Sequence, residues 1–239
     1  MATSGTTTFN PSVDEIIEEA YERTNIRGTR TGYQLKSARR SLNILLSEWG
    51  NRGIHLWKIK LASVPLVEGQ ALYNWTSDTT NFPTDISDVL EAYVRNNTTA
   101  TAPVDTALSK IDRSTYSALP NKLSKGTPSQ YYVQRTVAPS IFLFQTPSSS
   151  FSGSNFQLKF FYVARIQDAG AYTNESDVVY RFIPCMTAGL SYYLSLKYSP
   201  ETVQANKLIY EDEFKRALDE DGQRTSTFIT PQTFYGDGV

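Results

Sequence analysis

The chain has 239 residues, 40% of them hydrophobic and 20% charged, with a formal net charge of −1. These values are typical of a globular protein with one or two domains, and the charge argues against general attraction to nucleic acid. The single cysteine, Cys185, rules out an internal disulfide and a cysteine-based structural zinc site, so a reducing compartment of synthesis is expected. No apolar run reaches the roughly 20 residues of a membrane span, and residues 1–10 do not have the pattern of a signal peptide.

The first predicted helix begins shortly after Asn10. Asn10 is a possible N-cap, Pro11 suits a first turn, and Ser12 with Glu15 has the spacing of a capping box. The apolar residues that follow repeat at helical spacing on one stripe: Val13, Ile16, Ile17, Ala20 and Tyr21.

A second helix is predicted over residues 33–49, and Gly50 and Gly53 end it. Its apolar residues recur every three or four positions, as in an amphipathic helix: Leu35, Ala38, Leu42, Leu45, Leu46 and Trp49. We expect the first two helices to form an antiparallel pair.

From residue 57 the pattern changes to the two-residue period of half-buried strands. Trp57, Ile59 and Leu61 alternate with lysines. Two later runs have apolar residues at every second position: Leu90, Ala92 and Val94, and then Phe156, Leu158, Phe160 and Tyr162. A short helix is expected over residues 109–118, ended by Pro120. The predicted strands cover residues 57–61, 70–73, 89–95, 131–135, 141–145 and 157–166.

Helical signals return at Pro184, and a last helix is predicted to begin at Ser199 and Pro200. In the helix after Pro184, small residues would let another helix approach closely: Ala188, Gly189 and Ser191. Beyond Gly222 the composition predicts an extended tail.

The predicted fold class is therefore α+β. The N- and C-terminal helices are expected to form one four-helix bundle that carries an inserted antiparallel β-domain, with an extended C-terminal tail. The predicted parts are an N-terminal helix pair at 9–53, the β-domain with its short helix at 54–175, a C-terminal helix pair at 176–221 and an arm at 222–239.

Charge is uneven along the chain. Basic residues dominate from Arg23 to Lys60, and acidic residues dominate from Glu211 to Asp221. The two segments could meet within one subunit or between neighbours, or could form separate solvated faces. The candidate contact residues are Arg23, Arg27, Arg39, Arg40, Glu211, Asp212 and Asp219.

Catalytic patterns are scarce. The one histidine, His55, lies on the predicted strand face of Trp57 and is expected to be structural, as is a buried Cys185. There is no phosphate-binding loop or dinucleotide fingerprint. Asp85 and Asp88 form a carboxylate pair of the kind a glycosidase uses, but they lie in a predicted turn. We expect no enzymatic activity, cofactor or metal.

Five segments resemble the head-to-tail adaptor proteins of short-tailed phages, a family also described as tail tubular protein A or packaged-DNA stabilisation proteins. They occur in the family's order and cover most of residues 9–221: FNPSVDEIIEEAYERTNIRGTRTGYQLKSARRSLNILLSEWGNRGIHLWKI, NKLSKGTPSQYYVQR, IFLFQTPSS, FQLKFFYVARI and FIPCMTAGLSYYLSLKYSPE. The tail after Gly222 matches nothing in the family pattern.

The resemblance implies a structural virion protein, made in the host cytoplasm and located in the neck or tail. It implies a ring of usually twelve copies between the portal protein and the tail nozzle protein, through which double-stranded DNA passes, without membrane insertion. It also implies a C-terminal arm that reaches the portal, and the tail's composition suggests four anchors for it: Phe228, Ile229, Phe234 and Tyr235. Two alternatives stay open, a virion-associated cell-wall hydrolase that uses Asp85 and Asp88, and another ring component of the tail or neck.

Overall fold

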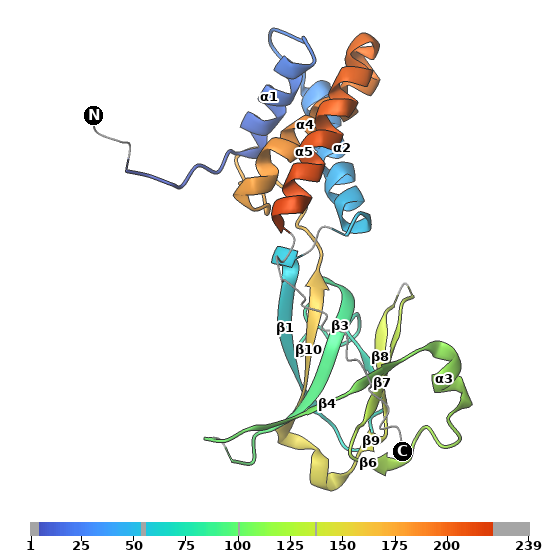
Figure 1. Cartoon of the computed structure of the whole chain (residues 1–239). Coiled ribbons are helices and arrows are strands. Elements are labelled where there is room, and N and C mark those ends of the chain that lie inside the picture. The colour runs from blue at the N-terminus through green and yellow to red at the C-terminus, as the bar shows by residue number, and fades with distance from the viewer. Residues whose placement is uncertain (1–4, 54–55, 100, 137, 222–239) are drawn as a thin grey trace, which may run out of the picture. The chain divides into compact units, whose positions relative to one another are not determined.

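The computed structural model describes residues 5–53, 56–99, 101–136 and 138–221. Over these residues the chain forms five α-helices, four short 3₁₀ helices and ten strands, which confirms the α+β class. Two compact units are present: one takes the described residues of Met1–Ser41 and Val179–Val239, and the other is Leu42–Val178. Figure 1 shows the elements of each unit. No helix in the described ranges is long and apolar enough to cross a membrane.

The first unit begins with α1 (Val13–Arg23), whose N-cap is Ser12 and not Asn10, the other residue considered for this position. The Ser12 hydroxyl accepts a hydrogen bond from the Glu15 backbone N–H at 3.3 Å, and the Ser12 backbone N–H donates to the Glu15 carboxylate at 2.8 Å. The capping box is therefore confirmed, and it satisfies backbone groups that a helix end leaves unpaired. The predicted apolar stripe is buried: Val13, Ile16, Ile17, Ala20 and Tyr21.

The remaining helices of this unit are the start of α2 (Gly32–Asn51), then α4 (Ile183–Tyr198) and α5 (Val203–Asp221). Short 3₁₀ turns precede the last two, η3 at Tyr180–Phe182 and η4 at Pro200–Thr202. Both α1 and α5 approach α4 closely. The small residues predicted to permit this approach are buried in α4, as expected: Ala188, Gly189 and Ser191.

The predicted four-helix bundle is wrong. Within the described residues, α2 makes no backbone approach to the other helices comparable to those of α1 and α5 on α4. It reaches them through side chains: the Tyr21 hydroxyl donates to the Gln34 carbonyl at 3.0 Å, and the Lys197 ammonium donates to the Ser41 hydroxyl at 2.6 Å. The boundary between the two units also falls inside α2, after Ser41.

The apolar stripe of α2 lies on both sides of this boundary. Ala38 lies in the helical unit, whereas Leu42, Leu45, Leu46 and Trp49 lie in the unit that contains the strands, and all are buried. Periodicity shows that a helix face needs cover, but it does not show which partner covers it.

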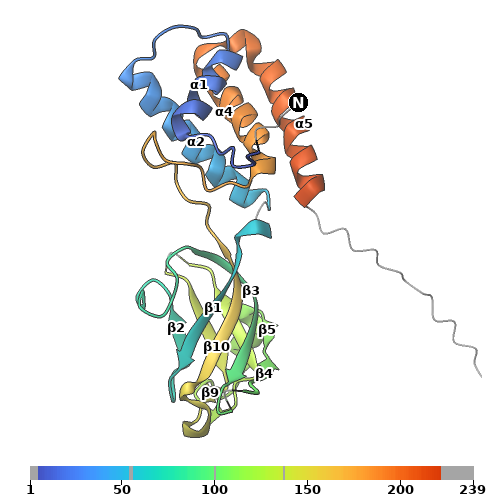
Figure 2. The same ribbon diagram turned by 90° about the vertical axis from the view of Figure 1, so that its left-hand side faces the viewer.

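The second unit contains a four-stranded antiparallel sheet with the order β1-β10-β3-β4 (Figure 2). Its strands are β1 (Ile59–Leu66), which follows the 3₁₀ turn η1 (Leu56–Lys58), then β3 (Ile86–Asn96), β4 (Val104–Ala107) and β10 (Gly153–Ala164). Along β10 the predicted alternation is confirmed, with Leu158, Phe160 and Tyr162 buried.

A second sheet has the order β2-β8-β7-β5, and a two-stranded pair β6-β9 completes the unit. The prediction of an antiparallel β-domain is wrong in part, because β5 pairs with β7 in parallel and β6 pairs with β9 in parallel. The bounds are β2 (Leu72–Asn74), β5 (Ser109–Ile111), β6 (Lys125–Gly126), β7 (Gln130–Gln134), β8 (Ser140–Phe144) and β9 (Thr146–Pro147); the short helices are α3 (Arg113–Ala118) and η2 (Ser149–Phe151).

The predicted phase of β1 is also wrong. Leu61 is 47% exposed and faces outward, whereas Ala62, Val64 and Leu66 are buried in the hydrophobic core of this unit. A strand with apolar residues on both faces gives no clear alternation, so the buried face is decided by the neighbouring sheet rather than by the local pattern.

Candidate functional site

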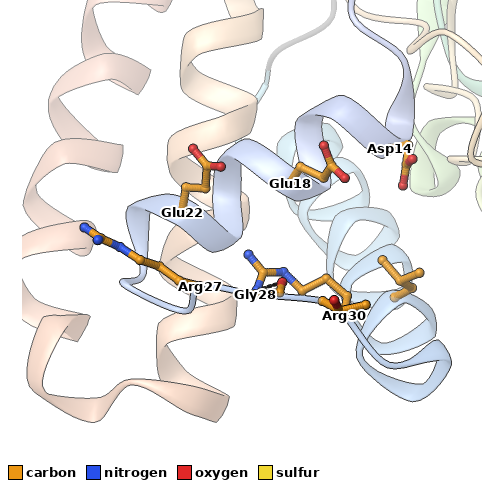
Figure 3. Close-up of a pocket in the computed structure, with 8 residues that line it drawn as sticks. Asp14, Glu18, Glu22, Arg27, Gly28 and Arg30 are labelled. Carbon is orange, nitrogen blue, oxygen red and sulfur yellow. Dashed lines mark hydrogen bonds between the residues drawn. The ribbon is translucent and has the colours of Figure 1, made fainter.

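An open groove of about 750 Å³ lies beside α1 in the helical unit. Figure 3 shows Asp14, Glu18 and Glu22 along one face of α1, above the basic connection to α2. These three acidic residues are spaced four positions apart, which places them on one side of a helix. The groove therefore presents an acidic wall facing the basic connection.

Arg30 stabilises the connection between α1 and α2. Its guanidinium donates to the Gly28 carbonyl at 2.9 Å and lies 4.6 Å from the centre of the Tyr21 ring, a cation–π contact. Gly28 has a φ of 97°, a conformation that favours glycine. Burial and the neighbouring Tyr198 raise the pKa of Tyr21, although the Arg30 charge opposes this. Tyr21 thus stays protonated and works as a packing and hydrogen-bonding group.

The predicted basic contact residues lie on α1, the connection and α2. Arg23 pairs with Glu19 one turn away at 2.8 Å, and Arg27 lines the acidic groove. Arg40 is exposed and Arg39 is half-buried on α2. The structure therefore leaves Arg27 and Arg40 on the surface of the chain.

The predicted acidic contact residues, Glu211, Asp212 and Asp219, are exposed on α5. Asp212 is engaged within its own helix by Arg216. The sequence did not single out Asp221, whose side chain is only 3% exposed and pairs with Arg181. Both ion pairs are formed inside the helical unit.

Sequence reasoning also missed three exposed apolar side chains. Leu196, in the last turn of α4, is 51% exposed, and Leu208 and Ile209, near the start of α5, are 63% and 51% exposed. Buried apolar residues stand close by in the sequence, Leu194 in α4 and Tyr210 in α5, so the local pattern gives no signal that these three side chains face outward.

The carboxylate pair considered for catalysis is engaged in ion pairs. The Lys60 ammonium donates to Asp85 at 2.8 Å and the Tyr162 hydroxyl donates to it at 3.2 Å, while Asp88 pairs with Arg135. Partial burial would raise the pKa of Asp85, but the hydrogen bond and charge of Lys60 outweigh it and lower the pKa. An ionised, paired carboxylate is suited to holding strands together.

The remaining candidates from the sequence are Cys185, possible metal ligands, His55 and the anchors of the C-terminal arm. Cys185 is buried in α4. No cluster of three or more histidine, cysteine, aspartate or glutamate side chains suited to a metal occurs among the described residues. His55 and the predicted arm anchors Phe228, Ile229, Phe234 and Tyr235 lie outside the described residues.

The described residues form a two-unit α+β protein that exposes charged side chains and several large apolar side chains. No protein-family model matches the sequence, and no curated protein matches it significantly. Among solved structures, the chain is similar to one described as "Neck of empty GTA particle computed with C6 symmetry", with 8% identity and a TM-score of 0.27 over 81% of this chain and 84% of that chain. A likeness with so low a TM-score carries no argument about function.

Proposed function

We propose that this chain is a structural component of a phage neck, and specifically a subunit of the head-to-tail adaptor ring that joins the portal to the tail nozzle. The sequence resemblance supports this, because its segments fall on α1, α2, β7, β8, β10 and α4, which include the core elements of both units. In this proposal the chain is not an enzyme, needs no cofactor, and resides in the virion after synthesis in the host cytoplasm.

The observation that carries the proposal is the exposed apolar group on the α4–α5 hairpin, Leu196, Leu208 and Ile209. Each is about half exposed or more, whereas Leu190 and Leu194 of α4 and Tyr210 and Phe214 of α5 are buried. Contact with a neighbouring subunit would remove these side chains from water, which stabilises an assembly by about 25 cal/mol for each Å² of apolar surface.

Replacing Leu208 and Ile209 together by aspartate tests this surface. We expect the variant to keep the wild-type melting temperature, because neither side chain is part of a buried core, yet to lose assembly into rings on portal. Gln204→Asp, an exposed change on the same helix, is the matched control. Normal ring assembly by the double variant, seen by negative-stain microscopy, would contradict the proposed contact.

A ring also needs two different patches that meet head to tail. We place Arg23, Arg27, Arg39 and Arg40 of one subunit opposite Glu211, Asp212 and Asp219 of the next. The exposed position of Arg40 and of the three acidic residues supports this pairing. Surface pairs of this kind steer association and fix register more than they add affinity.

Charge reversal of Arg39 and Arg40 to glutamate tests the pairing. We expect weaker ring assembly, with a loss that shrinks as salt rises, because added ions screen the contact in both proteins. Sedimentation of wild-type and variant protein at low and high salt measures it. Equal assembly at every salt concentration would remove these arginines from the interface.

For the arm, we propose that Phe228, Ile229, Phe234 and Tyr235 anchor residues 222–239 on the portal. Truncation after Asp221 preserves the Arg181–Asp221 ion pair that ends α5. The truncated protein should therefore fold with an unchanged melting temperature but bind portal at least about tenfold more weakly, a loss of about 1.4 kcal/mol. Wild-type affinity for portal, measured by pull-down or interferometry, would disprove an anchoring role.

A further inference from the structure

The four-stranded antiparallel sheet of the second unit has two edge strands that differ from each other. Its order, β1-β10-β3-β4, places β1 at one edge and β4 at the other (Figures 1 and 2). Within the described ranges, β1 pairs only with β10 and β4 pairs only with β3. Edge strands carry backbone groups that can pair with another strand, so each edge is a potential docking position.

The directions of the strands make these two edges complementary. All three neighbouring pairs in the sheet are antiparallel. With four strands in alternating directions, β1 and β4 run in opposite directions. A second copy in the same orientation would therefore present its β1 antiparallel to β4, and the junction would continue the pattern of the sheet.

The exposed side chains of β4 point to the same conclusion. All four residues of β4 are exposed. In the register of β3 and β4, Val104 lies opposite Asn96 and Thr106 lies opposite Val94. Val94 is buried in the core of this unit, so Val104 and Thr106 lie on the side of the sheet that faces the core, the inner side. Val104 is nevertheless 61% exposed. A further strand added at this edge would cover such an exposed apolar side chain.

The other edge strand, β1, has the same alternation of inner and outer side chains over residues 61–64. On β1, Ala62 and Val64 face the core, whereas Leu61 is exposed on the outer side and Ser63 is exposed as well. Pro65 has no backbone N–H, which limits pairing beyond Val64. Because register follows the inner and outer alternation, the best match places Val104 opposite Val64, Thr106 opposite Ala62 and Ala107 opposite Leu61.

We propose that β4 of one copy pairs with β1 of the next copy, so that the sheet β1-β10-β3-β4 runs continuously across the subunit boundary. This inference rests on the proposed ring, since it describes one of its contacts. The contact joins two different edges, so it repeats from copy to copy and is not used up by a dimer.

A pair of introduced cysteines, Leu61→Cys with Ala107→Cys, tests the junction. Opposite residues in antiparallel strands have Cα atoms roughly 4.5–5.5 Å apart, which suits a disulfide. Within one copy these positions are three strands apart, at about 14 Å, so they cannot bridge. Both sites are exposed, and the native Cys185 is buried. A thermal melt of the reduced variant checks that it folds.

Rings assembled alone or on portal are oxidised and run on a denaturing gel without reductant. We expect a ladder that extends beyond the dimer and collapses when reductant is added. The matched control is Leu61→Cys with Glu91→Cys, because Glu91 is exposed on the interior strand β3. The control, and each single-cysteine variant, should give at least about tenfold less of the bands beyond the dimer.

The outcomes separate this inference from the proposed function. Assembled rings that release only monomers, or no more ladder than the control, would overturn the strand junction while the ring remains. In that case the two edges would be open to a strand of another protein. A chain that forms no ring under any condition would overturn both.

Discussion

Charged side chains of the strand unit are arranged to stabilise the sheet rather than to react. Asp85, just before β3, receives hydrogen bonds from Lys60 on β1 and from the Tyr162 hydroxyl on β10. One carboxylate therefore ties three neighbouring strands at one end of the sheet. Burial and the nearby Asp85 charge raise the pKa of Tyr162 to about 12, so its hydroxyl remains a donor across the ordinary pH range.

The Asp85→Asn variant should be less stable than the wild type at neutral pH, with a pH-dependent difference. Because the pKa of Asp85 in the folded protein lies below its ordinary value of 3.8, the ionised group stabilises the fold above that pH. This contribution falls away as the pH drops through the lower, folded pKa, where the carboxylate is protonated. Melting temperatures of both proteins from pH 7 to pH 2 measure this.

We expect the two melting curves to converge at the acidic end. Asp168→Asn, which changes an exposed loop aspartate, is the matched control and should alter the melting temperature little at any pH. A difference between Asp85→Asn and wild type that stays constant over the whole range would show that the ion pair is not its source.

At the scale of elements, α4 organises the helical unit. It buries residues on most of its circumference, and both α1 and α5 pack closely against it. The approach depends on small side chains such as Ala188, which is 2% exposed. A larger side chain there has no free volume to occupy, since protein interiors are close-packed.

Ala188→Leu should therefore destabilise the protein by about 1–3 kcal/mol, the usual cost of overpacking a core. Urea unfolding followed by circular dichroism gives the free energy. The control is Leu196→Ala on the exposed side of the same helix, which should change the free energy of unfolding by less than about 0.5 kcal/mol. Equal effects of the two substitutions would mean that α4 does not occupy the central position described.

The elements also show how far the sequence could be interpreted. Local signals predicted α1 with its Ser12 cap, α2, α5 and the longer strands, because capping and periodicity act over a few residues. These local signals gave wrong predictions where pairing between strands far apart in the sequence determines the structure. Residues 109–118 were predicted as one helix, but Ser109–Ile111 pair with β7, and α3 begins only after Asp112, whose carboxylate accepts from the Thr115 N–H at 2.8 Å.

Irregular pairing accounts for other differences. Leu90 was predicted on the buried face of β3, yet it is only half-buried, because the register with β10 shifts between Glu91 and Val89. The strands β4, β6 and β9 have two to four residues each, too few to show a period. Among surface sites, charged segments were visible in the sequence, whereas the exposed Leu208 and Ile209 needed the structure.

At the scale of the whole molecule, the net charge of −1 gives no strong attraction to DNA, which suits the proposed ring, because DNA would have to traverse it without adhering. The proposed contacts are of three kinds: apolar side chains on α4 and α5, opposite charges on separate helices, and unpaired sheet edges. The charge contact and the strand junction each join unlike patches, so each favours a ring over a two-fold dimer.

The most direct test of the proposed role is native mass measurement of the purified full-length chain, alone and after mixing with portal rings. The account predicts that portal takes up a fixed number of copies as one closed ring, so that a single heavier species appears in excess chain. Portal that keeps its own mass at every concentration of this chain, or that binds a variable number of copies, would contradict it.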